Sequence, residues 1–181
     1  MFRRSKKKSG QINVDQDKGH LFLEESDLNL LMLRPIDLIE FAEFAGANAD
    51  DILIWVGKTI GKSFSESQEE SEREWATESM HDKKEFINGV LEMLTNIGYG
   101  ALKSMFKKDE VFISVSEPVS TGERENIMAK NLCLLYQGIF NGIFEFVDVD
   151  ADGEEVQCYL LGDEACVFRF ELRLEEFNDE E

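Results

Sequence analysis

Hydrophobic residues recur with a helical spacing along the first half of the chain. Apolar positions three and four residues apart predict helices over residues 35–46, 48–64 and 86–98. A proline opens the first helix, an asparagine can cap the second, and a glycine follows the first and the third. Two short apolar segments, 20–23 and 28–33, precede these helices and are predicted to be strands or extended chain.

Beyond the third helix, the spacing of apolar residues changes to the two-residue alternation of strands. It does so over residues 105–115, where Pro118 ends the run, and again over 156–174. Between them, residues 126–144 predict one long helix, while residues 65–85, rich in Ser, Glu and Lys, predict a loop followed by an exposed helix. This order of elements is typical of an α+β fold in which helices pack on an antiparallel sheet.

The composition indicates one globular domain. The chain has 181 residues, of which 43% are hydrophobic and 10% aromatic, so it can build a core. Its 14 phenylalanines and 2 prolines exclude collagen-like, low-complexity and wholly disordered chains. We expect a flexible basic tail over residues 1–18, a single domain over 19–175 and an acidic tail over 176–181.

Charge is distributed unevenly along the chain. The formal net charge is −19, and five of the 19 basic residues lie in residues 1–8, where there is no acidic residue. Residues 9–181 therefore hold 14 basic and 38 acidic residues, a net charge of −24. Such a body repels phosphate backbones, so we expect no nucleic-acid partner. The basic tail is expected to be solvated, and contact with an anionic lipid surface or an acidic partner is the alternative.

The sequence contains no segment that predicts membrane insertion or secretion. No apolar run approaches the ~20 residues needed to cross a bilayer, and no apolar stretch follows the basic N-terminus. We therefore expect a cytoplasmic protein without stable membrane insertion. In that compartment, three cysteines are expected to be free thiols or metal ligands rather than a disulfide framework.

Two predicted helices carry glycines four residues apart, which places both glycines of a pair on one helix face. The pairs are Gly57 with Gly61 and Gly138 with Gly142. Glycine costs about 1 kcal/mol relative to alanine inside a helix, so each pair requires a compensating role. Close approach of two helices is one such role, and room for a ligand beside the backbone is the other.

Three cysteines and one glutamate form the strongest candidate for chemistry: Cys133 on the long helix, then Glu155, Cys158 and Cys166. A hairpin with a three-residue loop centred on Gly162 would place Cys158 directly opposite Cys166, with their Cβ atoms ~5 Å apart on one face. Two thiolates in that position suit a tetrahedral zinc ion. The alternative is that the cysteines are buried apolar residues, because no two of them are separated by only two residues.

This candidate site depends on two further features. Glu155 is an odd number of residues from Cys158, so on a regular strand it would face away, and it could ligate only if the chain still turns at residues 152–153. Three thiolates, a carboxylate and a divalent ion sum to a charge of about −2, which requires nearby donors. The candidates are backbone amides, the N-terminal end of the long helix, Lys130 and Arg169.

Three segments resemble the 4-vinyl reductase domain family. They are residues 155–168, which contain the glutamate and two cysteines, residues 131–142, where a cysteine is followed by spaced glycines, and the glycine-bearing helix 49–62. The resemblance runs in the same order over roughly residues 20–175. It implies a fold shared with TRAPP-type trafficking adaptors and haem-based nitric-oxide sensors. Family members include stand-alone archaeal proteins and the sensory domains of transcription activators that respond to aromatic compounds.

The resemblance also implies a zinc ion held by three cysteines and a glutamate, beside a buried pocket for a small aromatic molecule. Carried over by position, these ligands are Cys133, Glu155, Cys158 and Cys166. We expect no activator role, because no ATPase or DNA-binding segment accompanies the domain in this sequence. Neither of the two histidines has the sequence context of a haem ligand, so no haem site is expected.

One further motif competes for a metal ion. Residues 148–153 resemble the opening of an EF-hand calcium loop, but the twelfth position is Tyr159 instead of a bidentate glutamate. The segment also leads into a predicted strand, whereas an EF-hand loop leads into a helix. We therefore expect a polar turn between the long helix and the hairpin.

Nothing in the sequence predicts classical catalysis, because it contains no recognisable nucleophile–base pair or phosphate-binding glycine loop. We interpret the chain as a zinc-containing domain that binds or senses a small apolar or aromatic molecule, as a homodimer. Tyr136, Gln137 and Phe140 share a helix face with Cys133 and, with Trp55, are the candidate ligand-binding residues; the alternative is that they are ordinary core. A non-catalytic interaction adaptor is the alternative function, and a reductase, as in the family name, is the third.

Overall fold

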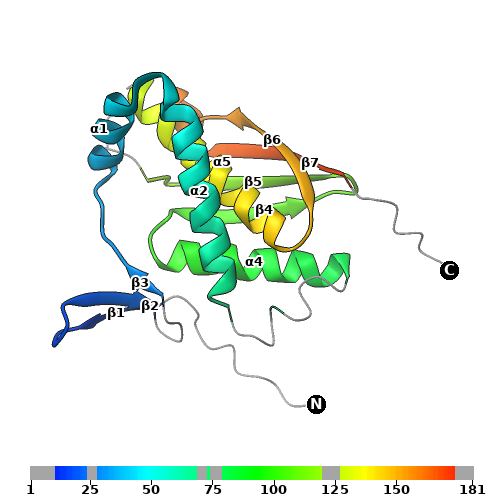
Figure 1. Cartoon of the computed structure of the whole chain (residues 1–181). Helices are drawn as coiled ribbons and strands as arrows, with labels where there is room; N and C mark the ends of the chain where they lie inside the picture. Colours follow the sequence, from blue (N-terminus) through cyan, green and yellow to red (C-terminus); the bar gives the residue numbers. More distant parts are fainter. Residues whose placement is uncertain (1–10, 24–27, 69–72, 74–78, 120–126, 174–181) are drawn as a thin grey trace, which may run out of the picture.

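A four-stranded antiparallel sheet forms the framework of the C-terminal half (Figure 1). The structure is a computed structural model that describes residues 11–23, 28–68, 73, 79–119 and 127–173. The strands lie in the order β4-β5-β7-β6, with the bounds β4 (Ala101–Phe106), β5 (Glu110–Ser116), β6 (Asp150–Gln157) and β7 (Cys166–Arg173). Alternate residues are buried, among them Val111 and Ile113 of β5 and Phe168 and Phe170 of β7, so one face of the sheet belongs to the core.

Helix α5 (Ile127–Phe146) is packed between the sheet and helix α2 (Ala49–Glu66) (Figure 1). On the sheet side, the ring of Phe140 lies against Phe168, with ring centroids 5.2 Å apart. On the other side, α5 and α2 are in close contact along their lengths. A helix covered on two sides has to be apolar over most of its surface, which explains the density of hydrophobic residues in this segment.

The four helical glycines bring α2 and α5 into direct backbone contact. A Cβ atom added to Gly57 would lie closer than 3.0 Å to the carbonyl oxygen of Leu135, and one added to Gly138 would clash with the carbonyl oxygen of Ile54. The second glycine of each pair faces backbone atoms of the opposite helix in the same way. Of the two roles considered for these glycines, the structure shows close helix approach, because backbone fills the space where a ligand would have to lie.

Helix α4 (Met80–Asn96) completes the core beside α5. The ring of Phe86 stacks on Phe146 of α5, with centroids 5.4 Å apart. Ser79 caps the helix, because its hydroxyl accepts a hydrogen bond from the backbone N–H of Asp82. The remainder of the predicted loop before α4 lies largely outside the described residues.

A second, smaller sheet precedes the helices. It consists of three antiparallel strands in the order β1-β2-β3, with the bounds β1 (Ile12–Asp15), β2 (His20–Leu23) and β3 (Asn29–Leu30). Leu23 is buried and joins the main core, which attaches this sheet to the body. Helix α1 (Pro35–Ala45) follows, and the 3-10 turn Gly46–Asn48 leads directly into α2.

The structure confirms the predicted α+β class and the antiparallel sheet. It differs from the sequence prediction at the N-terminus, where residues 12–15 form β1 instead of part of a flexible tail. Apolar Ile12 and Val14 alternate with polar residues there, and a turn closed by the Gly19 N–H and the Asp15 carbonyl pairs β1 with β2. The rest of the predicted tails, residues 1–10 and 176–181, lies outside the described residues.

The predicted extended segment 28–33 contains only the two strand residues of β3. None of the described helices combines the length and the apolar character that crossing a bilayer requires.

Candidate metal centre

Helix α5 directs Cys133 toward the edge of the buried sheet face. Tyr136 and Phe140 follow Cys133 by three and seven residues and therefore lie on the same helix face. Both rings lie near Phe168 of β7, with centroids 6.4 and 5.2 Å away. The Cys133 thiol, which is buried, therefore reaches the beginning of β7, where Cys166 starts the strand.

Cys158 and Cys166 come from the two sides of the β6–β7 hairpin. Gln157 pairs with Val167 at the end of the ladder, and this register, continued by one residue, places Cys158 opposite Cys166. The connection differs from the predicted three-residue loop, because the ladder ends at Gln157 and Tyr159–Leu161 form a 3-10 turn. The Asp163 carboxylate holds this turn by accepting a 2.8 Å hydrogen bond from the backbone N–H of Cys158.

A β-bulge in β6 turns Glu155 toward the cysteines. Glu155 pairs with Phe168 whereas Gln157 pairs with Val167, so β6 has one extra residue, Val156. The extra residue changes the alternation of the strand and places Glu155 on the same face as buried Phe168, while Val156 itself is 45% exposed. The sequence analysis expected a turn at residues 152–153 to orient Glu155 toward the cysteines. That prediction is wrong, because both residues pair with β7 inside the ladder.

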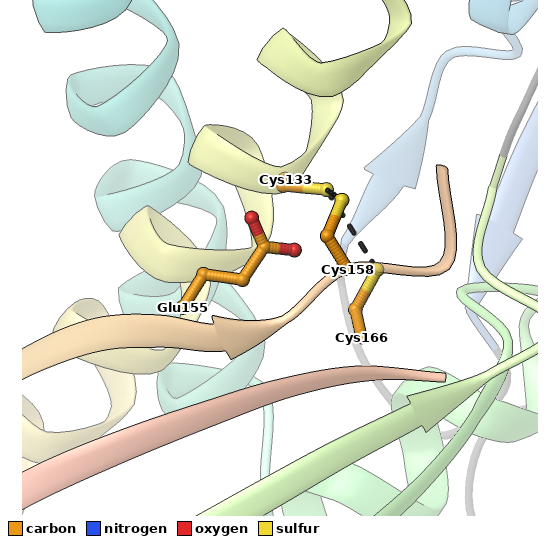
Figure 2. Close-up of side chains that lie close together, drawn as sticks. All are labelled: Cys133, Glu155, Cys158 and Cys166. Carbon is orange, nitrogen blue, oxygen red and sulfur yellow. Dashed lines mark hydrogen bonds between the residues drawn. The ribbon is translucent and has the colours of Figure 1, made fainter. Parts of the chain in front are cut away.

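The four side chains converge on one point (Figure 2). Cys133 Sγ lies 3.8 Å from Cys158 Sγ and 3.7 Å from Cys166 Sγ, and one donor atom from each of the four residues lies within 4.8 Å of the others. A tetrahedral zinc ion with Zn–S bonds of ~2.3 Å separates two sulfur ligands by ~3.8 Å. These sulfur spacings are therefore those of a tetrahedral thiolate site.

The thiols share hydrogen bonds that change their acidity. The hydrogen bond from Cys133 lowers the pKa of Cys166, and the same bond, together with burial, raises the pKa of Cys133. Burial raises the pKa of Cys158. The thiols of Cys133 and Cys158 therefore keep their protons at neutral pH unless a cation displaces them.

Glu155 distinguishes this cluster from three buried thiols alone. Its Oε1 atom is buried and has no hydrogen-bond partner. Burying a carboxylate oxygen without a partner is costly, and a cation between the carboxylate and the thiols would compensate it. Three sulfurs and one carboxylate are also the donor set that zinc accepts, so the residues fit the ion that the sequence analysis predicts.

Backbone amides supply the donors that such a charged centre requires. The N–H groups of Tyr159 and Leu160, at the start of the 3-10 turn, are hydrogen-bonded to the thiols of Cys166 and Cys158. Arg169, the other donor predicted from the hairpin, does not take part. It lies an odd number of residues from Cys166, so it projects from the opposite face of β7 and pairs with Glu154 at 2.7 Å.

Two further sequence predictions concern this region: Lys130 as a donor to the metal centre, and the segment that resembles an EF-hand. The side chain of Lys130 lies outside the described residues. The segment that resembles an EF-hand passes through a turn at Asp148, with φ of 52°, and then enters β6. Within the described residues, only Cys133, Glu155, Cys158 and Cys166 form a group of three or more acidic, cysteine or histidine ligands close enough to share an ion.

Two of the four candidate ligand-binding residues are buried beside the thiols. Tyr136 is 2% exposed and Phe140 is fully buried. The Tyr136 hydroxyl donates a 2.9 Å hydrogen bond to the carbonyl of Tyr99 and accepts a 2.8 Å hydrogen bond from the N–H of Val119. In the structure these side chains therefore fill the space beside the cluster.

The other two candidates lie in different surroundings. Gln137 donates a 2.8 Å hydrogen bond to the carbonyl of Gly153, which ties α5 to the strand that carries Glu155. Trp55 is 67% exposed, on the side of α2 opposite Gly57, which faces α5. The structure thus brings Tyr136, Gln137 and Phe140 to one region and leaves Trp55 at the surface.

Sequence reasoning missed an open cleft where α2, α5 and the beginning of β6 meet. It measures about 600 Å³, and it is lined by Ile54, Lys58, Asn141, Glu145 and residues 148–151. Glu145 pairs with both Lys58 and Lys62 of α2 across its wall. In the sequence, the four-residue spacing of Asn141 and Glu145 places both polar residues on one helix face, which is the signal that could have indicated this cleft.

Comparison with family models matches residues 124–172 to the V4R domain. The match covers α5 and the β6–β7 hairpin, so it includes all four side chains of the cluster. It confirms the resemblance to the 4-vinyl reductase domain. No curated protein matches the sequence significantly.

Solved structures of other proteins share the fold, among them the following three. The phenol-responsive sensory domain of the transcription activator PoxR, solved with phenol, has a TM-score of 0.62 over 91% of this chain and 87% of that chain, with 11% identity. The H-NOX domain from Shewanella oneidensis in the Fe(II)CO ligation state has a TM-score of 0.53 over 77% and 73%, with 12% identity. Subunit 3 of a trafficking protein particle complex from Naegleria fowleri, covalently bound to palmitic acid, has a TM-score of 0.50 over 77% and 96%, with 16% identity.

Proposed function

We propose that this chain, which matches the V4R domain over residues 124–172, is a zinc-containing domain that binds or senses a small apolar or aromatic molecule. The observation that carries the proposal is the convergence of Cys133, Glu155, Cys158 and Cys166 at the spacing of a tetrahedral site. Four protein ligands leave no coordination position for water, so the ion has a structural role. It would tie α5 to the β6–β7 hairpin at the point where the aromatic residues of α5 lie.

The fold and the chemistry of Tyr136 support the ligand part of the proposal. The PoxR sensory domain, which shares this fold, is described as phenol-responsive and was solved with phenol. In this chain the Tyr136 hydroxyl already joins the carbonyl of Tyr99 to the N–H of Val119. A phenolic ligand carries the same hydroxyl group and could make the same two hydrogen bonds once Tyr136 moves aside. We propose that such a ligand binds against Tyr136 and Phe140, with Gln137 holding the adjacent strand.

Thermal unfolding of the zinc-loaded chain tests this proposal. Phenol at about 100 times its dissociation constant should stabilise the protein by ~2.7 kcal/mol, which is visible as a rise in Tm. Cyclohexanol is the matched control, because it carries the hydroxyl on a non-aromatic ring. Removal of zinc by a chelator should lower Tm and abolish the response to phenol. If neither phenol nor a broader set of aromatic molecules changes Tm, the ligand part of the proposal is wrong.

A second candidate function is a non-catalytic interaction adaptor. Two observations favour it: the space beside the cluster is filled by Tyr136 and Phe140, and Phe44 on α1 is 91% exposed. The trafficking-complex subunit that shares the fold is named as part of a larger assembly. An absent response to aromatic molecules, together with retained zinc, would favour this function. For either function we propose that the chain acts as a homodimer.

A further inference from the structure

The second half of helix α5 carries polar side chains on one stripe, at Gln137, Asn141 and Glu145. These residues are four apart and therefore lie above one another on the helix, and the residues between them are apolar, aromatic or glycine. The two outer members have partners on neighbouring elements. Gln137 donates a 2.8 Å hydrogen bond to the carbonyl of Gly153 in β6, and Glu145 pairs with two lysines of α2. These contacts explain why two of the three polar residues stand on an otherwise apolar helix.

Asn141, the middle member of the stripe, has an amide oxygen that the fold does not use. Its Oδ1 atom is buried and has no hydrogen-bond partner, although the residue lines the open cleft between α2, α5 and the beginning of β6. A buried acceptor without a partner costs stability, and a leucine of similar size would avoid this cost. The terminal torsion of asparagine is soft, so rotation of the amide would turn Oδ1 into the cleft and would break no hydrogen bond of that oxygen.

The lining of the cleft combines apolar surface with negative charge. Its apolar residues are Ile54 of α2 and Val149 and Ala151 at the beginning of β6. Its charged residues are Lys58, Glu145, Asp148 and Asp150, which sum to a net charge of −2. The lysine of this lining is already paired with Glu145, so the excess charge that a ligand would meet in the cleft is negative.

We propose that this cleft binds a small aliphatic ammonium compound, which donates a hydrogen bond to Asn141 Oδ1 and lays its hydrocarbon part on Ile54 and Val149. The volume of the cleft, about 600 Å³, is typical of sites for small molecules. The site is separate from the metal centre, because Asn141 follows Cys133 by eight residues, ~12 Å along the axis of α5. The proposal is therefore independent of the proposed function and adds a second binding site to it.

An ammonium group matches the cleft better than a neutral or an anionic group does. It supplies three hydrogen-bond donors and no acceptor, so it can satisfy Asn141 Oδ1 without adding an unpaired acceptor. Asp148 lies two helical turns further along the same side, because the N–H of Asp148 continues the last turn by donating to the carbonyl of Glu145. The exposed carboxylate of Asp148 therefore attracts a cation in the cleft and repels an anion.

An NMR titration of the zinc-loaded full chain with n-hexylammonium chloride tests the proposal. We expect the backbone amide signals of residues 149–151 to shift until the site is saturated, while those of Tyr136 and Cys166 stay in place. Hexyltrimethylammonium is the matched probe, because it keeps the positive charge and the hydrocarbon chain but has no N–H group. It should bind about tenfold more weakly or worse, since hydrogen bonds from a charged donor are the stronger kind. Hexan-1-ol keeps a donor without the charge and should also bind more weakly.

Three variants locate the binding. Asn141→Leu should weaken hexylammonium binding about tenfold, and without the amine its Tm should equal or exceed that of the unmodified chain, because an unpaired buried acceptor is removed. Asp148→Asn should weaken binding about threefold through the lost charge, and asparagine tolerates the φ of 52° at this position. Glu92→Gln is the matched control, because it removes the same charge from an exposed position on α4 and should leave binding unchanged.

Several results would overturn the proposal. One is the absence of saturable shifts at residues 149–151, and another is equal binding of hexylammonium and hexyltrimethylammonium. An Asn141→Leu variant that binds as tightly as the unmodified chain, or that has a lower Tm without the amine, would do the same. Equal losses from Asp148→Asn and Glu92→Gln would reduce the binding to general attraction by an acidic protein. Zinc content measured in the same samples distinguishes a failure of this site from a failure of the metal centre.

Discussion

One extra residue in β6 decides whether the candidate metal site has three ligands or four. Without the bulge at Val156, Glu155 would stand on the solvent side of the strand, as its odd distance from Cys158 predicts. The identity of the four candidate ligands could be predicted from residue type and resemblance. The orientation of Glu155 does not, because a bulge depends on how two strands pair and leaves no fixed pattern in one strand.

The acidity of the thiols predicts how zinc binding varies with pH. Folding raises the pKa of Cys133 and of Cys158. Without zinc, the two protonated thiols therefore contribute fully to stability below the unfolded pKa of about 8.5. This contribution is lost as pH rises beyond that value. Zinc binds the deprotonated thiols, so the affinity of the site for zinc rises as pH rises. The difference in Tm between zinc-loaded and chelated protein should therefore grow from about pH 6 to about pH 9. Thermal unfolding at several pH values measures it, and a difference that shrinks over this range would contradict the site.

At the scale of elements, the most extensive helix–helix contact joins α2 and α5. It fixes the position of α5, the helix that carries Cys133, relative to α2. Backbone meets backbone at Gly57 and Gly138, so the contact cannot adjust by rotating a side chain. We therefore expect substitutions at these glycines to disturb stability strongly.

Gly57→Ala should destabilise the protein by about 2 kcal/mol or more, because the new methyl group overlaps the carbonyl oxygen of Leu135. Gly89→Ala is the matched control: Gly89 is also helical, but a Cβ atom there meets nothing within 4 Å. That variant should gain about 0.5–1 kcal/mol from helix propensity. Chemical denaturation of both variants measures the difference. Equal stabilities would mean that the two helices are not in backbone contact.

Most of the elements could be predicted from the sequence, because their hydrophobic periods are long and regular. The helix predicted over 126–144 is found at Ile127–Phe146, and the one predicted over 48–64 at Ala49–Glu66. Shorter elements are less determined by their own residues. β1 spans only four residues, so the alternation of Ile12 and Val14 with polar residues is too short to predict a strand without its pairing with β2.

At the scale of the whole molecule, the candidate centre joins two layers that are distant in sequence. Cys133 comes from the helical layer, and Glu155, Cys158 and Cys166 come from the β6–β7 hairpin (Figure 2). A zinc ion there would fasten the helix to the hairpin where no covalent bond does. The sequence could predict the members of this site through their spacing and resemblance. It could not predict the filled aromatic region or the exposed Trp55, because both depend on how whole helices are oriented.

The most direct test of the account is the zinc content of the purified full chain, measured by native mass spectrometry beside two variants. Glu155→Gln removes a ligand, and Glu154→Gln alters the neighbouring carboxylate, which is 62% exposed and paired with Arg169 on the other face of the strand. We predict one zinc ion per chain, an affinity weakened by about tenfold or more in Glu155→Gln, equivalent to ~1.4 kcal/mol, and no change in Glu154→Gln. A folded chain that holds no zinc when zinc is supplied, or variants that bind it equally well, would contradict the account.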